Sequence, residues 1–248
     1  MNDEARSIAD RIAAVQARIA AAAARAQRSP DEITLIAVTK THPARRIAHV
    51  LASGGLDLGE NRVREAEEKH EFFATANPPP RWHLIGHLQR NKARRALGLF
   101  DLIHSVDDLR LAETLNRLVD ADSATGQRRL PILLQVNVSG EATKQGFSLI
   151  GGADSASWPA FLATVRQIVA LPLIEVQGLM TIAPYSDDLE GVVRPCFRSL
   201  RAVRDRLATE VPAGDWRHLS MGMSGDFELA IEEGATLVRV GTAIFGER

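Results

Sequence analysis

The feature that most constrains the fold of this chain is a repeated alternation of short apolar segments with longer amphipathic ones. Eight short runs that contain apolar residues have the length of strands: residues 33–40, 56–60, 82–87, 100–106, 130–138, 174–180, 216–223 and 236–245. Helical stretches separate nearly all of them, notably residues 43–53, 62–75, 107–122, 158–170, 189–210 and 227–233. Strands that alternate with helices in this way predict a parallel sheet covered by helices.

The number of repeats favours a closed barrel over an open sheet. Eight repeats in about 215 residues match the size of a single (β/α)8 TIM barrel. The competing fold, a doubly wound open sheet, is expected to carry a glycine-rich phosphate turn after its first strand, but residues 39–43 contain no glycine. No linker rich in Pro, Gly or Ser divides the chain, so we expect one domain over residues 1–248.

A helix is predicted before the barrel, within residues 1–29, and it ends at Ser29 and Pro30. Apolar residues follow helical spacing, and arginines recur at seven-residue intervals on a second stripe; these are Ile8, Ile12, Val15 and Ile19, and Arg11, Arg18 and Arg25. We expect this amphipathic helix to pack on the barrel with the arginines on a solvated outer face.

Composition excludes several classes of protein. The 30 Lys and Arg residues against 31 Asp and Glu leave a net charge of −1, so no overall field attracts the protein to nucleic acid or anionic membranes. The single cysteine, Cys196, rules out an intramolecular disulfide and a cysteine-rich metal cage, and a buried structural thiol is expected there. The acidic start has no apolar signal region, and no apolar run approaches the roughly 18 residues that span a bilayer. These observations predict a cytoplasmic protein.

Two weaker patterns were weighed against simpler interpretations. His83 and His87 are spaced to share a strand face, but a third ligand at metal spacing is not visible, so we expect no metal. Residues 87–95 (HLQRNKARR) are basic enough to contact RNA. A solvent-facing turn and helix after the third strand is the favoured interpretation of that segment.

The first candidate for chemistry is Lys40, at the end of the first strand. In a barrel of this type, functional side chains collect at the carboxyl ends of the strands. Thr41 and Pro43 follow as a predicted N-cap and first helical residue, which leaves the lysine amine over the barrel mouth. Desolvation or a nearby cation lowers a lysine pKa, and the neutral amine then forms a Schiff base with a carbonyl. Taken alone, a solvated loop lysine is the simpler interpretation.

The second candidate is Arg239, two residues before Gly241 in the last strand. Strand alternation places residues 237, 239 and 241 on one face, and the apolar neighbours of Arg239 indicate burial. A buried guanidinium requires acceptors for its hydrogen bonds. Either a carboxylate, such as Glu60 or Glu228, or an atom of a ligand would meet that requirement.

The third candidate is a pair of loops, residues 218–226 and 240–246. Their glycines expose backbone N–H groups, a helix begins after the first loop, and three hydroxyls are available from Ser220, Ser224 and Thr242. Phosphate commonly binds at the loops after strands seven and eight of a (β/α)8 barrel. The alternative is two ordinary turns in which Ser224 or Asp226 caps a helix. No Walker loop is present, because Gly246 is followed by Glu247 and Arg248.

A lysine able to form a Schiff base, a buried arginine and a phosphate site at one barrel mouth indicate a phosphorylated aldehyde. Pyridoxal 5′-phosphate (PLP) fits this description. The coincidence of the three features is stronger than any one of them.

Six sequence blocks resemble the pyridoxal phosphate homeostasis protein family (YggS-like or PROSC-like). They are IAVTK (36–40), GENRVREAEEK (59–69), WHLIGHLQRNKAR (82–94), LLQVNVSGEATKQGF (133–147), GLMTIAPY (178–185) and the terminal run 219–248. The resemblance begins near residue 33. It implies a single barrel similar to the N-terminal domain of alanine racemase, with PLP held as an internal aldimine on the lysine that matches Lys40.

The resemblance also implies roles for other positions. Ser220, Gly241 and Thr242 match phosphate-binding positions, and Met223 and Ser224 lie in the adjoining loop. Arg239 matches the arginine that faces the pyridine nitrogen. Asn61 matches an asparagine beside the cofactor, and His83 matches a residue of the cofactor pocket. Lys144 lies in a loop that the family implicates in cofactor handling.

The resemblance predicts a PLP carrier or regulator rather than an enzyme. Arg239 keeps its proton, so it leaves the pyridine nitrogen unprotonated and weakens the ring as an electron sink. The related racemases add a catalytic tyrosine from a further domain of the partner subunit, whereas the one tyrosine here, Tyr185, follows the sixth strand. We expect a monomer that acts in PLP (vitamin B6) and amino-acid homeostasis, with apo PLP-dependent enzymes as partners and no nucleic acid or membrane. The alternatives are a racemase-like fold-type-III PLP enzyme of low or narrow activity, a phosphate-sugar-binding barrel, and an RNA-contacting protein.

Overall fold

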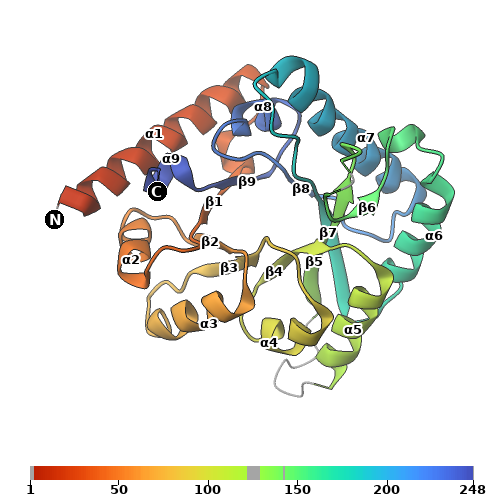
Figure 1. The fold of residues 1–248 in the computed structure, drawn as a ribbon, viewed down its shortest axis with the longest axis horizontal. Coiled ribbons are helices and arrows are strands. Elements are labelled where there is room, and N and C mark those ends of the chain that lie inside the picture. The colour runs from red at the N-terminus through yellow and green to blue at the C-terminus, as the bar shows by residue number, and fades with distance from the viewer. Residues whose placement is uncertain (1–2, 122–128, 142, 248) are drawn as a thin grey trace.

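The computed structural model of the protein describes residues 3–121, 129–141 and 143–247. Within these residues, eight parallel strands close into a barrel that helices surround (Figure 1). The barrel strands are β1 (Thr34–Val38), β2 (Asp57–Glu60), β3 (Arg81–Leu84), β4 (Leu102–Val106), β5 (Leu130–Asn137), β7 (Ile174–Met180), β8 (His218–Ser220) and β9 (Leu237–Val240). The pairing of β1 with β9 and of β4 with β5 completes the circle. The predicted (β/α)8 barrel is confirmed, and the open sheet is excluded.

Each of the eight predicted strands overlaps one of these strands, with β3 beginning one residue before its predicted run, but the last predicted strand is too long. β9 ends at Val240, and residues Thr242–Phe245 form the short helix α9. The amides of Ile244 and Phe245 both donate to the carbonyl oxygen of Gly241 at 2.9 Å, which turns the chain out of the strand. Ile244 and Phe245 are buried in the helix as they would be in a strand, so an apolar run did not distinguish the two.

An outer ring of helices follows the strands in the order that the alternation predicts. Its members are α2 (Ala44–Ala52), α3 (Val63–Phe72), α4 (Ala93–Leu97), α5 (Leu109–Asp120), α6 (Trp158–Val169), α7 (Arg194–Glu210) and α8 (Phe227–Glu232). A π-helix over Leu189–Val193 leads into α7, and the two-residue strand β6 (Phe147–Ser148) pairs with the end of β5. No helix within the described residues has the length and apolar character needed to cross a membrane.

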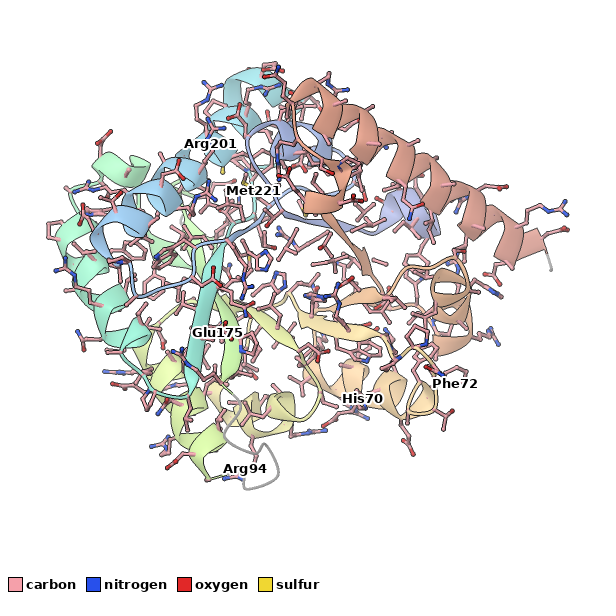
Figure 2. The ribbon with its side chains drawn as sticks, turned by 180° about the vertical axis from the view of Figure 1, so that it is seen from behind. His70, Phe72, Arg94, Glu175, Arg201 and Met221 are labelled. Carbon is pink, nitrogen blue, oxygen red and sulfur yellow. The ribbon has the colours of Figure 1, made fainter. Side chains whose placement is uncertain are left out.

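The basic segment 87–95 forms a 3-10 turn (Arg90–Lys92) and the start of α4. Arg94 is exposed and points outward from the helix ring (Figure 2). Arg95 forms an ion pair with Glu67 of α3. The expected turn and helix are therefore present in this segment.

Helix α1 (Asp3–Arg25) lies across the barrel exterior, beside α8 and α9 (Figure 1). The expectation of a solvated arginine stripe on this helix holds in part: Arg11 and Arg25 are exposed, whereas Arg18 is half-buried. Arg18 donates to both carboxylate oxygens of Glu228, at 3.1 and 3.0 Å, and Arg25 donates to Glu232 at 2.7 Å. The two glutamates stand four residues apart on α8 and so present one acidic face to α1.

The hydrophobic core has two parts. The larger part lies between the strands and the helices. A separate cluster of five buried side chains, each from a different strand, fills the inside of the barrel: Ile36, Leu102, Leu133, Met180 and Leu237. The rest of the interior includes buried polar side chains, which is unusual because such barrels are mostly packed with branched apolar residues.

Candidate functional site

A cavity of about 770 Å³ opens at the carboxyl ends of the barrel strands. The loops after β1, β5, β7, β8 and β9 line it, and its volume lies within the range of about 300–1,000 Å³ that is typical of small-molecule and cofactor sites. Seven residues singled out from the sequence contribute to the lining: Lys40, Lys144, Met223, Ser224, Arg239, Gly241 and Thr242. The closure of the barrel brings these positions together from both ends of the chain.

Lys40 stands in a tight turn after β1. Thr39 anchors the turn to β2 through its amide, which donates to the Gly59 carbonyl at 2.9 Å, and Thr41 adopts a left-handed conformation with φ of 66°. The predicted cap is wrong, because Pro43 occupies the N-cap position, two residues after Thr41, and α2 begins at Ala44. The left-handed residue directs the chain away from the strand immediately after Lys40.

A buried charged group supports this turn from the helix side. The Lys69 ammonium donates to the Thr39 carbonyl at 2.7 Å, to Glu60 Oε1 at 2.5 Å and to Glu65 Oε1 at 2.7 Å. The Thr39 hydroxyl also donates to Glu60, and the Thr41 amide donates to Glu65. Both neighbours of Lys40 in the chain are therefore bonded to what we call the Lys69 cluster (Lys69, Glu60 and Glu65).

Glu60 is the least solvated member of the Lys69 cluster, with 0% of its surface exposed. Burial raises the pKa of its carboxyl above the ordinary value, although hydrogen bonds from Lys69 and Thr39 act in the opposite direction. Its second oxygen, Oε2, is buried and has no hydrogen-bond partner among the described residues. Glu60 thus depends on Lys69 for its stability in the fold.

The loop after β8 is shaped by Gly222, whose φ is 93°. A Cβ atom at this position would lie 2.6 Å from the Ala230 Cβ and 2.9 Å from the Phe227 Cα, so a larger residue would displace α8. The Gly222 carbonyl accepts from the Arg239 amide at 3.0 Å, which attaches the loop to β9. Asp226 accepts from the Met223 amide at 2.5 Å and closes the loop.

The Ser224 hydroxyl oxygen lies where two backbone donors converge. It accepts from the amides of Gly241 at 3.2 Å and Ala243 at 3.3 Å, at the junction of β9 and α9. Convergent amide donors beside a hydroxyl form an arrangement that suits an anionic oxygen. Thr242 lies between these two amides and also lines the cavity.

Arg239 reaches the cavity from the barrel interior and is 4% exposed. Its Nη1 donates to the Ser220 hydroxyl at 2.6 Å, and its Nη2 donates to the Thr181 carbonyl at 2.8 Å. Burial lowers the pKa of Arg239 to about 10, so the side chain is still a cation at neutral pH. The predicted burial is confirmed.

The carboxylate acceptors proposed for Arg239 are wrong. Glu60 faces α3 and bonds to Lys69, and Glu228 lies on α8 and bonds to Arg18. Both residues stand outside the barrel wall, whereas the Arg239 side chain is inside it. The acceptors that the structure supplies are a hydroxyl and a backbone carbonyl.

Three residues predicted for the site do not line the cavity. Ser220 is fully buried inside the barrel, where its hydroxyl contacts Arg239 and His104. It therefore lies apart from the Ser224 hydroxyl and the two amides that donate to that hydroxyl. His83 lies deeper in the interior, in contact with His104 and Asp57. Asn61 follows β2, and its backbone passes so near Gly86 that a Cβ there would lie 2.4 Å from the Asn61 oxygen.

Two loops contribute residues that the sequence analysis did not assign to the site. Asn137, at the end of β5, donates to the Glu141 carbonyl at 2.9 Å and holds the loop that brings Glu141 and Lys144 to the cavity as an ion pair. After β7, Ile182 and Tyr185 line the rim, and Tyr185 is 99% exposed. Their position after strand ends is the signal that would have identified them.

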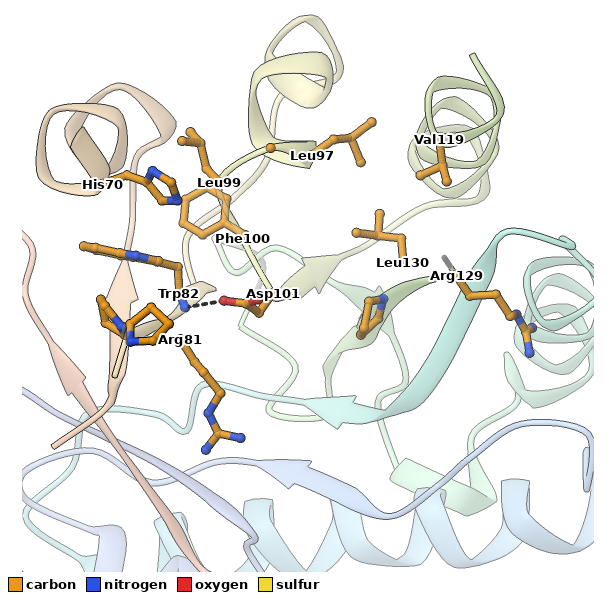
Figure 3. Close-up of a pocket in the computed structure, with 14 residues that line it drawn as sticks. His70, Arg81, Trp82, Leu97, Leu99, Phe100, Asp101, Val119, Arg129 and Leu130 are labelled. Carbon is orange, nitrogen blue, oxygen red and sulfur yellow. Dashed lines mark hydrogen bonds between the residues drawn. The ribbon is translucent and has the colours of Figure 1, made fainter. Parts of the chain in front are cut away.

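A second hollow, of about 500 Å³, lies at the opposite end of the barrel (Figure 3). Its lining mixes polar and apolar surface and includes residues near the starts of β3, β4 and β5, among them Trp82, Phe100 and Leu130. It contains none of the predicted site residues. We therefore place the candidate site in the larger cavity.

The described residues contain no group of three side chains that suits a metal ion. His87 bonds to Asp107 at 3.0 Å, apart from His83. Cys196 is buried, as predicted, and burial raises the pKa of its thiol to about 11.

Comparison with known proteins decides the family. The family model described as alanine racemase, N-terminal domain, matches residues 11–248. A pyridoxal phosphate homeostasis protein of Aquifex aeolicus is 40% identical over 239 residues, which cover 96% of this chain and 97% of the relative. The protein of the same name from Escherichia coli is 40% identical over 250 residues, with 100% and 98% coverage. The chain belongs to the pyridoxal phosphate homeostasis protein family. The resemblance drawn from the six sequence blocks is confirmed.

A solved structure of this family extends the comparison. PipY of Synechococcus elongatus, in a structure described as having PLP bound, superposes with a TM-score of 0.79 at 38% identity, over 96% of this chain and 100% of PipY. The agreement covers the barrel and the helices around it. The family and its fold therefore rest on both sequence and structure.

Proposed function

We propose that this protein binds PLP in the larger cavity, holds it covalently on Lys40, and acts in PLP and amino-acid homeostasis rather than as a catalyst. The observation that carries the proposal is that one cavity is lined by a lysine, a buried cation and a hydroxyl with two amide donors: Lys40, Arg239 and Ser224. Each of these groups suits a different part of PLP. The names of the homologues and the PLP-bound PipY structure support the same conclusion.

The residues present fit the covalent part of the proposal. The neutral Lys40 amine adds to the aldehyde carbon, the aldehyde oxygen leaves as water, and a C=N bond forms. Lys40 is partly exposed at the cavity, so it is accessible to a ligand that enters from solvent. The Lys69 cluster keeps Lys40 in place because it bonds to both flanking residues.

The phosphate would be held where Ser224 meets the amides of Gly241 and Ala243. Phosphate oxygens are strong acceptors, and backbone N–H groups together with hydroxyls are their common partners at this corner of the barrel. Thr242 supplies a second hydroxyl-bearing side chain to the same lining. We do not assign Ser220 to this role, because its hydroxyl is bonded inside the barrel.

Arg239 supports a carrier in preference to a catalyst. Bound PLP supplies an aldehyde for attachment and a ring that withdraws electrons most strongly when its nitrogen is protonated. Arg239 donates hydrogen bonds and keeps its proton, so it leaves a facing ring nitrogen unprotonated. Tyr185, which is almost fully exposed, is not fixed by packing as a proton donor within the cavity.

The test is to load the purified protein with PLP, reduce it with borohydride and locate the pyridoxyl group by mass spectrometry. We expect the label on Lys40, and we expect the Lys40→Ala variant to lose both the label and the visible absorbance of the Schiff base. Circular dichroism of the variant controls for folding. A label on Lys144 with none on Lys40 would overturn the assignment.

A second measurement separates a carrier from a racemase-like enzyme. The loaded protein is incubated with amino acids in deuterated water, and exchange of the α-proton is followed by NMR. A carrier exchanges the proton no faster than free PLP does. Exchange well above that rate would contradict the carrier function and support a racemase-like enzyme.

The proposal also covers domain organisation, oligomeric state, location and partners. We propose that residues 1–248 act as one domain, that the protein is a cytoplasmic monomer, and that apo PLP-dependent enzymes receive PLP from it. Sedimentation measures the oligomeric state, and cell fractionation measures the location. Activation of an apo-enzyme by the loaded protein, in the presence of a scavenger of free aldehyde, tests direct transfer.

A further inference from the structure

Five buried side chains form a continuous series of hydrogen bonds across the barrel interior. Asp57 Oδ1 lies 2.9 Å from His83 Nε2, and His83 Nδ1 lies 3.0 Å from His104 Nε2. His104 Nδ1 lies 2.8 Å from the Ser220 hydroxyl, which accepts from Arg239 at 2.6 Å. These residues come from β2, β3, β4, β8 and β9, and we call them the polar row.

With both histidines neutral, the two ends of the polar row set the direction of every hydrogen bond within it. Arg239 has only donors, so Ser220 must accept from it, and the Ser220 hydrogen is then available to His104 Nδ1. His104 must next donate from Nε2 to His83 Nδ1, and His83 must donate from Nε2 to Asp57. The carboxylate of Asp57 only accepts. In this arrangement both histidines carry their hydrogen on Nε2 and accept at Nδ1.

The polar row places a negative charge at one end and a positive charge at the other. Burial of a cation without a carboxylate is costly, and the two hydrogen bonds that the Arg239 side chain makes within the described residues end on a hydroxyl and a carbonyl. Asp226 attracts Arg239 through space, but burial raises the pKa of that carboxyl. Burial acts in the same direction on Asp57, yet hydrogen bonds from His83 and Arg81 outweigh it and lower the pKa of Asp57. Asp57 thus keeps a negative charge at the far end of the polar row.

We propose that Asp57 is a positioning residue for the cofactor site, and that it fixes the orientation of Arg239 through His83, His104 and Ser220. This inference rests on the proposed function, in which Arg239 faces the ring nitrogen of PLP. Asp57 begins β2, whereas the cavity lies beyond the ends of the strands. The polar row therefore connects the amino-terminal end of the barrel with the ligand site at the other end.

The structure offers an isosteric variant and a matched control. Asp57→Asn keeps an oxygen that accepts from His83 but removes the negative charge at that end of the polar row. Arg81 donates to the other Asp57 oxygen at 2.7 Å, and its side chain is 62% exposed. Arg81→Gln removes this surface partner and leaves the charge of Asp57 in the row.

The first experiment uses the ligand-free protein and does not depend on PLP. NMR of ¹⁵N-labelled histidine rings reports which nitrogen carries the hydrogen. We expect His83 and His104 as neutral rings with the hydrogen on Nε2, and we expect Ser220→Ala to keep this tautomer of His104, because His83 Nδ1 still accepts from it. A hydrogen on Nδ1 of either ring in the native protein would overturn the direction of the row.

The second experiment compares equilibrium binding of PLP with that of 1-deazapyridoxal 5′-phosphate, which has a C–H group in place of the ring nitrogen. We expect Asp57→Asn to weaken PLP binding about tenfold, equal to about 1.4 kcal/mol, and to change analogue binding by less than about twofold. Arg81→Gln should affect neither. Thermal unfolding of each variant checks that it is folded.

The possible failures are distinguishable. If the native protein binds PLP and the analogue equally well, the proposed contact between Arg239 and the ring nitrogen is wrong. If the native protein prefers PLP and Asp57→Asn keeps the whole preference, the positioning role of Asp57 is wrong while the proposed function stands. If the variant does not fold, the tautomer measurement on the native protein still decides the direction of the row.

Discussion

Replacement of Lys69 by methionine is the most direct test of how the fold holds Lys40. The substitution keeps a side chain of similar length but removes an ammonium group that is 6% exposed. That group makes three hydrogen bonds, to the Thr39 carbonyl, Glu60 and Glu65. Its loss leaves the Glu60 carboxylate buried without a cation.

The structure sets the size of the expected effect. Removal of one partner from a buried ion pair costs about 3–5 kcal/mol. Glu65 is 23% exposed and regains water, whereas Glu60 has no exposed surface, so the unpaired Glu60 dominates the loss. We expect Lys69→Met to lower the free energy of unfolding by about 3–4 kcal/mol. Domains are typically stable by about 5–15 kcal/mol, so the variant should still fold at 25 °C.

Urea denaturation followed by circular dichroism measures this loss. The Glu60→Gln variant removes the charge of the partner but leaves Lys69 bonded to Glu65, so its cost should be about 1–2 kcal/mol. The double variant should lose at least about 1 kcal/mol less than the sum of the two single losses, because the buried charge is absent. We also expect weaker PLP binding by Lys69→Met, since the turn around Lys40 loses its support.

Two outcomes would refute this reasoning. A loss below about 1 kcal/mol for Lys69→Met would mean that the pair is no stronger than a surface ion pair. Additive losses in the double variant would mean that the two groups are not coupled, whatever their distance. Either result would remove the Lys69 cluster as the support of the Lys40 turn.

Three further predictions follow from single contacts. Ser224→Ala should weaken PLP binding by about 1–2 kcal/mol in a titration, and unchanged affinity would contradict the phosphate assignment. Burial lowers the pKa of His104 well below 6.5, so the unfolded chain binds more protons than the folded one. The free energy of unfolding should therefore fall as pH falls below 6.5, by at most about 1.4 kcal/mol per pH unit. In urea denaturation between pH 7 and 5, His104→Gln should reduce this pH dependence. Arg18→Ala removes the ion pair with Glu228 and a cation–π contact with Phe227 at 4.5 Å. Because the Arg18 side chain is 42% exposed, we expect thermal unfolding to show a loss of stability of about 0.5–1 kcal/mol. No loss would mean that these contacts do not stabilise α1 on the barrel.

The architecture of this protein could be predicted from local patterns. Each strand candidate was a short apolar run followed by an amphipathic stretch, and eight such units close into a barrel because parallel strands need covering helices on the outside. The same rule located the cavity residues. Lys40, Ser224 and Thr242 each follow a strand, and the carboxyl ends of parallel strands meet at one end of the barrel.

The errors concern side chains whose partners are distant in sequence. The ion pairs of Arg18 and Arg25 could not be predicted from the helix pattern, because their partners Glu228 and Glu232 lie more than 200 residues away. The strand that became α9 was misjudged because an apolar run is equally compatible with a buried strand and a buried helix. The Lys69 cluster was missed, since its members are separated by strand and turn residues with no shared motif.

Periodicity and spacing were sufficient for the barrel, for the cavity at its carboxyl end and for the lysine, arginine and serine that line it, because these depend on the local conformation of each strand and loop. The partners inside the barrel were decided by closure alone. His104 and Ser220 are 116 residues apart and meet at 2.8 Å only when β4 and β8 face each other across the interior. The distance between opposite strands is set by closure of the sheet, so it could not be predicted from the sequence of any one segment.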